Sequence, residues 1–167
     1  MRGALFLLTA VILMNGKEGA LLPVHETNHF QFLVSAPLSR AAPLSGPEGE
    51  RCWAGKEWNP EFLHPQPGKD VPGAVFTVQH GPHTSVWINT LLDRASGRMQ
   101  YVSFIPETMV FTVDVRLIAL DPSSTRVEVT YTRTALNPAA NHAVEAMGAT
   151  DRESGPQWQQ AIASCLH

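Results

Sequence analysis

Basic clusters, catalytic signature motifs and membrane-length apolar runs are all missing from this sequence of 167 residues. Its 12 Lys and Arg against 15 Asp and Glu give a formal charge of −3, and no stretch concentrates the positive charges. Nucleic-acid binding and charge-driven membrane binding both need such a concentration, so the composition argues against both. What is present is 44% hydrophobic and 16% charged residues, which indicates one globular domain with a hydrophobic core.

No apolar run approaches the roughly 20 residues that span a bilayer. The run at residues 4–14 follows Arg2 and is followed by polar residues and Ala20, which is typical of a secretory signal. Residues 1–20 are therefore predicted to be a signal peptide or leader, and residues 25–167 to be the folded domain, without a membrane span.

Glu18 stands where signal cleavage favours a small residue. An uncleaved anchor and a start codon placed upstream of the true domain therefore stay open as alternatives. The protein is expected to be exported, periplasmic or secreted, if the leader is a signal peptide, and cytoplasmic otherwise.

Cysteine is scarce, with only Cys52 and Cys165. They allow a single bridge in an oxidising compartment and would be two ordinary buried thiols in a cytosol. No C-x-x-C pair is present, so they do not predict a zinc site. His80 and His83 have a spacing seen in metal pairs, but they flank a Gly-Pro turn and no further ligands stand nearby, so no metal site is predicted.

Signature motifs of catalysis and cofactor binding are also missing. The chain has no G-x-S-x-G motif, no phosphate loop and no dinucleotide-binding glycine pattern. No cofactor and no catalytic residue is predicted, and the sequence favours a protein that is not an enzyme.

Alternating apolar and polar residues dominate the middle of the chain. In residues 108–120, Phe111, Val113 and Val115 fall on one face and Asp114 on the other. Such alternation indicates an antiparallel sheet with one buried face. The strands are predicted at residues 29–36, 62–63, 74–80, 84–93, 98–105, 108–120 and 125–135.

The end of the chain is predicted to be helical. Asn137 can cap a helix with Pro138 at its first position, and residues 139–150 are compatible with a helix. Gly155-Pro156 interrupts this run before a second amphipathic segment that carries Trp158. The tail is predicted to be either one kinked helix or two consecutive helices.

One strand, two short helices, a strand meander and a C-terminal helix is the element order of the helix-grip fold. The local sequences GPEGERCWAGKEWNPEFLHP (residues 46–65), PGAVFTV (72–78), YVSFIPE (101–107) and VEVTYTRTAL (127–136), with W-x-x-A-I (158–162), resemble the SRPBCC superfamily of START-related, polyketide cyclase-like proteins. The resemblance implies an α+β helix-grip fold, a curved antiparallel sheet wrapped around the C-terminal helix. The break at Gly155-Pro156 departs from the unbroken last helix of that superfamily.

The same resemblance implies a ligand cavity between the concave sheet face and the last helix. Alternation nominates its lining, although each of these residues could instead fill a solid core. The candidate ligand-binding residues are Phe76, Tyr101, Phe111, Val113, Val115, Val129, Tyr131, Arg133 and Trp158.

Polar and aromatic residues around this cavity have competing interpretations. Arg133 shares the inward face of Tyr131, so it would pair with a ligand carboxylate or reach water at the end of its strand. Glu48 and Glu50, beside Arg51, are interpreted as helix-start carboxylates favoured by the helix dipole. Trp53 and Trp58 are interpreted as packing anchors rather than as stacking platforms.

Three functional hypotheses follow from this picture. The first is binding of a hydrophobic or amphipathic small molecule. The second is a cyclase- or dehydratase-like enzyme, which needs at least two ionisable groups converging in the cavity. The third is an interaction module similar to chaperone-ATPase activators, which needs an exposed patch outside the cavity.

The resemblance also implies that the short helices support the end of the last helix, which would bring Cys52 and Cys165 together. If the protein is exported, we expect a disulfide that stabilises it by roughly 2–5 kcal/mol. Mass spectrometry of the secreted protein after thiol alkylation under native and denaturing conditions tests this. Two alkylated thiols in the unreduced protein would contradict it.

Overall fold

A computed structural model describes residues 21–166, so the predicted leader at residues 1–20 lies outside the described part of the chain. Within residues 21–166, no helix is both long enough and apolar enough to cross a membrane. The strands are β1 (His25–Val34), β2 (Glu61–His64), β3 (Val75–His80), β4 (His83–Asp93), β5 (Arg98–Ile105), β6 (Met109–Asp121) and β7 (Ser124–Ala135).

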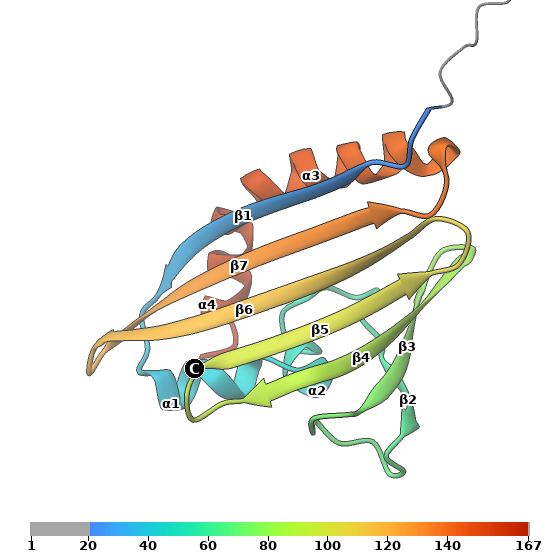
Figure 1. Cartoon of the computed structure of the whole chain (residues 1–167). Coiled ribbons are helices and arrows are strands. Elements are labelled where there is room, and N and C mark those ends of the chain that lie inside the picture. The colour runs from blue at the N-terminus through green and yellow to red at the C-terminus, as the bar shows by residue number, and fades with distance from the viewer. Residues whose placement is uncertain (1–20, 167) are drawn as a thin grey trace, which may run out of the picture.

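The seven strands form one curved sheet in the order β1-β7-β6-β5-β4-β3-β2, and every neighbouring pair is antiparallel (Figure 1). Irregular register in β2, β4 and β6 is of the kind that bends a sheet. The predicted helix-grip fold is confirmed, and so is the meander of strands.

The first strand begins earlier than predicted, at His25 instead of His29. Residues 25–28 are mostly polar and carry no apolar alternation, so the sequence pattern misses them. Pairing with β7 holds them in the sheet: Thr27 lies opposite Thr132, and their hydroxyls are 3.1 Å apart.

The predicted helical tail is confirmed as two consecutive helices, after a short 3-10 turn at Pro138–Ala140. The Asn137 side chain caps this turn by accepting a hydrogen bond from the Ala140 N–H. Helix α3 (Asn141–Glu153) runs alongside β1, and α4 (Gly155–Ala163) turns sharply away from it (Figure 1). Pro156 lies in the first turn of α4, where proline needs no N–H partner. The long helix of the expected fold is thus divided at Ser154.

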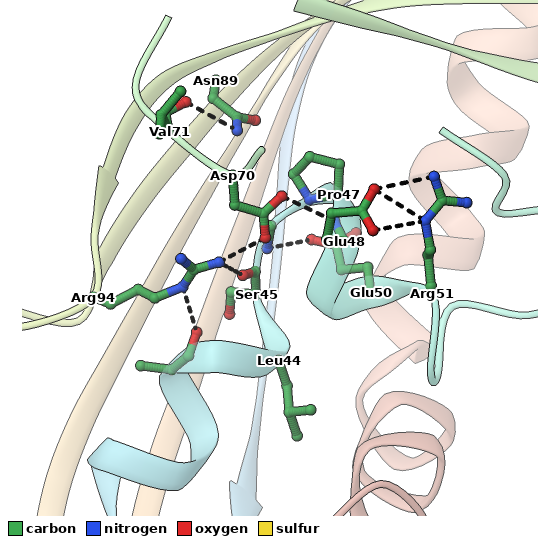
Figure 2. A network of polar contacts seen from close by, with 12 residues as sticks. Leu44, Ser45, Pro47, Glu48, Glu50, Arg51, Asp70, Val71, Asn89 and Arg94 are labelled. Carbon is green, nitrogen blue, oxygen red and sulfur yellow. Dashed lines mark hydrogen bonds and ion pairs between the residues drawn. The ribbon is translucent and has the colours of Figure 1, made fainter. Parts of the chain in front are cut away.

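Short helices follow β1, namely α1 (Leu38–Ala41), a 3-10 turn (Ala42–Leu44) and α2 (Pro47–Glu50). A polar network joins them to the sheet (Figure 2). Arg94 donates hydrogen bonds to the carbonyls of Ala42 and Ser45 and pairs with Asp70 at 2.7 Å. Asp70 in turn accepts a hydrogen bond from the Glu48 N–H at 3.0 Å, so the start of α2 is held in place.

A disulfide joins the segment after α2 to the end of the chain. Cys52 and Cys165 are bonded to each other, with Cα atoms 6.1 Å apart and a sequence separation of 113. Next to it, the indole rings of Trp53 and Trp158 lie 4.8 Å apart, and the Trp53 N–H donates to the Leu44 carbonyl. The segment after α2 and helix α4 are therefore held together covalently and by packing.

Gly46 occupies a position that only glycine fits well. Its φ is +104°, and a Cβ built there would lie 2.6 Å from the Asp70 carboxylate and 2.9 Å from the Arg94 guanidinium. We expect Gly46→Ala to lower the free energy of unfolding by about 2–4 kcal/mol, through backbone strain and disruption of the Asp70–Arg94 pair.

Gly55 is the matched control, because it too has a positive φ (+94°) but a Cβ there would meet no atom within 4 Å. Gly55→Ala should cost only about 1–2 kcal/mol. Urea unfolding of both variants measures the difference. Equal losses would show that the network does not depend on the close approach at Gly46.

Candidate functional site

A cavity of about 620 Å³ lies between the concave face of the sheet, the α1–α2 region and the C-terminal helices. This volume is within the range of small-molecule sites. Most lining side chains are apolar or aromatic, and a few polar groups are spread among them. The lining comprises Val34, Ala41, Leu44, Ser45, Glu50, Trp53, Ala54, Trp58, His80, His83, Ser85, Trp87, Tyr101, Ile105, Thr108, Met109, Phe111, Val113, Val115, Leu117, Val127, Tyr131, Arg133, Ala143, Met147, Gln157, Trp158, Ala161 and Ile162.

Seven of the nine residues predicted to line a cavity do so: Tyr101, Phe111, Val113, Val115, Tyr131, Arg133 and Trp158. The rings of Phe111 and Tyr131 are 6.3 Å apart, and both face the open space. The interior between sheet and helices is therefore not filled by these side chains.

Phe76 and Val129 do not line the cavity, although both are fully buried. Phe76 stacks on Trp87 with ring centroids 6.0 Å apart and also contacts Trp58 and Phe62, so other rings surround it. Alternation along a strand shows which face a residue is on, but it does not show what covers that face.

Arg133 is paired within the protein, an arrangement that neither sequence interpretation included. Its guanidinium forms a two-pronged ion pair with Asp151 of α3, and the Arg133 Nη2–Asp151 Oδ1 distance is 3.1 Å. Both side chains are less than 10% exposed. The guanidinium also lies over the Tyr131 ring, 4.2 Å from its centroid. The positive charge of Arg133, which was expected to meet a ligand carboxylate or water, is thus already compensated by Asp151.

Glu50 is an ionisable cavity residue that the sequence interpretation missed. Its Oε1 accepts a hydrogen bond from the Gly46 N–H at 3.3 Å, and within residues 21–166 no hydrogen bond reaches Oε2. Burial raises the pKa of this carboxyl from 4.5 to about 8; the nearby Asp70 raises it further, while the Gly46 N–H opposes the shift. Glu50 is therefore mostly protonated at neutral pH. A helix-start position explained its presence in the sequence, and only the tertiary structure turns its side chain toward the cavity.

Two tyrosines accompany Glu50. Burial, followed by the negative charges of Glu50 and Asp70, raises the pKa of Tyr101 well above its ordinary value. The Tyr101 hydroxyl is buried without a hydrogen-bond partner among the residues described. Burial likewise raises the pKa of Tyr131 beyond its ordinary range. Both phenols thus stay protonated and can donate hydrogen bonds.

All four tryptophans of the sequence line the cavity: Trp53, Trp58, Trp87 and Trp158. Trp53 and Trp58 do anchor the irregular segment, as predicted, since their indole N–H groups donate to the carbonyls of Leu44 and Pro47. Anchoring by the polar edge leaves the rings on the cavity wall. Trp53 and Trp58 therefore both anchor the segment and line the cavity.

His80 and His83 also reach the cavity lining, at an exposed turn. In the described residues, no group of three or more His, Cys, Asp or Glu side chains is placed to hold a metal ion. Glu48 does not line the cavity; its exposed side chain pairs with Arg51 at 3.1 Å.

Comparisons with known proteins give structural neighbours but no sequence relative. No protein-family model and no curated protein match the sequence. Norcoclaurine synthase from Thalictrum flavum, in complex with dopamine and hydroxybenzaldehyde, superposes with a TM-score of 0.65 at 13% identity, covering 98% of this chain and 96% of that one.

Two further neighbours widen the range of functions. The Zhui aromatase/cyclase from a Streptomyces species gives a TM-score of 0.61 at 14% identity, covering 86% of this chain and 94% of that one. Ara h 8.0201 gives 0.58 at 14% identity, covering 84% and 99%. Such identities establish the fold only. The class defined by fold and site is a helix-grip protein with a mostly apolar cavity between its sheet and its helices.

The elevated pKa of Glu50 predicts a pH dependence of stability. Between pH 4.5 and 8 the folded protein holds a proton that the unfolded chain has released. The free energy of unfolding should therefore fall as the pH rises through this window, by roughly 1–4 kcal/mol in total, and then level off.

Urea unfolding at pH 5.5, 7 and 8.5 measures this dependence, with the difference between wild type and Glu50→Gln as the readout. The variant should lack the decline, whereas Glu48→Gln, an exposed control, should retain it. A wild-type profile parallel to that of Glu50→Gln would show that Glu50 titrates normally.

Proposed function

We propose that the protein binds a hydrophobic or amphipathic small molecule in the cavity. The observation that carries the proposal is the 620 Å³ space itself, lined mainly by apolar and aromatic side chains and bounded by α4. A close-packed interior holds few voids larger than a water molecule, so an opening of this size needs an occupant or a function. Norcoclaurine synthase, a neighbour of the same fold, forms a complex with dopamine and hydroxybenzaldehyde, and this supports small-molecule binding.

Acid–base catalysis on the bound molecule is a second candidate, favoured by one observation. Glu50, with a pKa near 8, and the hydroxyl of Tyr101 converge at the cavity wall, as the enzyme hypothesis requires. A Glu50-dependent conversion of a bound compound, followed by mass spectrometry, would favour this candidate over binding alone. The interaction-module hypothesis stays a prediction.

The third part of the proposal is that the protein functions in an oxidising compartment. The bond between Cys52 and Cys165 supports it, because such bridges persist mainly in exported proteins. The residue pattern of positions 1–20 supports the same compartment.

A matched pair of substitutions tests whether the cavity binds ligand. N-phenyl-1-naphthylamine, a neutral apolar dye, should bind the wild type with increased fluorescence. Val113→Phe should fill part of the cavity and weaken dye binding tenfold or more, with a change in stability below about 1.5 kcal/mol.

Val129 is the control, because it is fully buried but does not line the cavity. Val129→Phe should overpack the core and cost about 1–3 kcal/mol. Absence of dye binding to the wild type, together with native mass spectra free of any co-purified ligand, would refute the proposed function.

A further inference from the structure

The described cavity lining offers no unpaired positive side chain to a ligand. Arg133 is the only arginine or lysine among the lining residues within 21–166, and Asp151 already neutralises it. The histidines at the lining, His80 and His83, are exposed. A ligand carboxylate would therefore enter an apolar space without a free cation to meet it, which is costly.

A positively charged ligand group would find a partner in Glu50. Glu50 presents an oxygen, Oε2, that accepts no hydrogen bond from residues 21–166. Asp70 lies beside it, but Arg94 pairs with Asp70 at 2.7 Å, so most of that negative charge is already compensated. A positive group placed beside Oε2 would pair with the Glu50 carboxylate itself and would allow the Glu50 carboxyl to ionise.

Aromatic faces complete the environment for a cation. The four tryptophans line the space, whereas the rings of Phe111 and Tyr131 are already in contact with the Arg133 guanidinium, 5.3 Å and 4.2 Å from their centroids. Aromatic rings attract ammonium groups through their π-faces, most strongly for tryptophan and in desolvated sites. They also bury the hydrocarbon part of such a molecule.

We propose that the cavity binds an organic amine, with its ammonium group at the Glu50 carboxyl and its hydrocarbon part against the tryptophan-lined wall. This rests on the proposed function and names the ligand class. On binding, the O–H bond of Glu50 breaks, its proton is released to the solvent, and the resulting carboxylate pairs with the ammonium. Tyr101 donates its free hydroxyl to that carboxylate.

Proton release makes the affinity depend on pH in a defined direction. With a Glu50 pKa of about 8 in the free protein, ammonium binding should strengthen about tenfold per pH unit between pH 6 and 8 and level off above. The charged groups around Glu50 are Asp70 and Arg94, from the loop and turn beside it, and Glu48 and Arg51, in and directly after α2. Tyr101 and Tyr131 stay protonated in this pH range.

Three probes of equal chain length test the proposal: octylamine, octan-1-ol and octanoate, each competing with N-phenyl-1-naphthylamine on the disulfide-bonded protein at pH 8. We expect octylamine to bind at least tenfold more tightly than octan-1-ol, and octanoate most weakly. Glu50→Gln should abolish the preference for octylamine and its pH dependence, while octan-1-ol affinity changes less than threefold.

Two variants keep the result interpretable. Glutamine retains the oxygen that accepts the Gly46 N–H, so Glu50→Gln should fold; Glu48→Gln, on the same helix and exposed, should behave like wild type. Equal binding of all three probes, a preference for octan-1-ol or octanoate, or an amine preference that survives Glu50→Gln would overturn the inference but leave ligand binding intact. If neither the dye nor any probe binds, the proposed function itself fails.

Discussion

The ion pair between Arg133 and Asp151 joins the last strand of the sheet to helix α3 where neither side chain reaches bulk water. A charge in such a place is tolerated only with a partner, so removal of either residue leaves a buried charge uncompensated. The pair therefore fixes where α3 lies on the sheet. It also affects the electrostatics of the cavity, because the one guanidinium that lines it among residues 21–166 is already paired with a carboxylate.

The remaining walls are held by different interactions. The Cys52–Cys165 bond and the Trp53–Trp158 contact tie the segment after α2 to α4, and Arg94 and Asp70 tie the start of α2 to the sheet. The contacts that hold α2 also place the Glu50 side chain at the cavity, close to Asp70. Burial there and the charge of Asp70 raise the pKa of the Glu50 carboxyl.

Neighbours of this fold include a synthase, an aromatase/cyclase and Ara h 8.0201, at sequence identities of 13–14%. A shared fold does not fix the chemistry of a site, which depends on individual side chains. In this chain those side chains are a protonated carboxyl, two phenols and four indoles around an internal ion pair. Specificity is therefore a matter of the lining, which sequence comparison at this distance does not reveal.

The sequence by itself determined the strands from β3 to β7, the capped helical tail with its break near Gly155-Pro156, and seven residues of the cavity lining out of nine predicted, because alternation and turn chemistry act between near neighbours in the chain. Tertiary structure alone decided the early start of β1, the exclusion of Phe76 and Val129 from the lining, the pairing of Arg133 with Asp151, and the inward turn of Glu50. Each of these depends on what a residue distant in sequence places against it. A local pattern can assign a side chain to a face but cannot identify what that face meets.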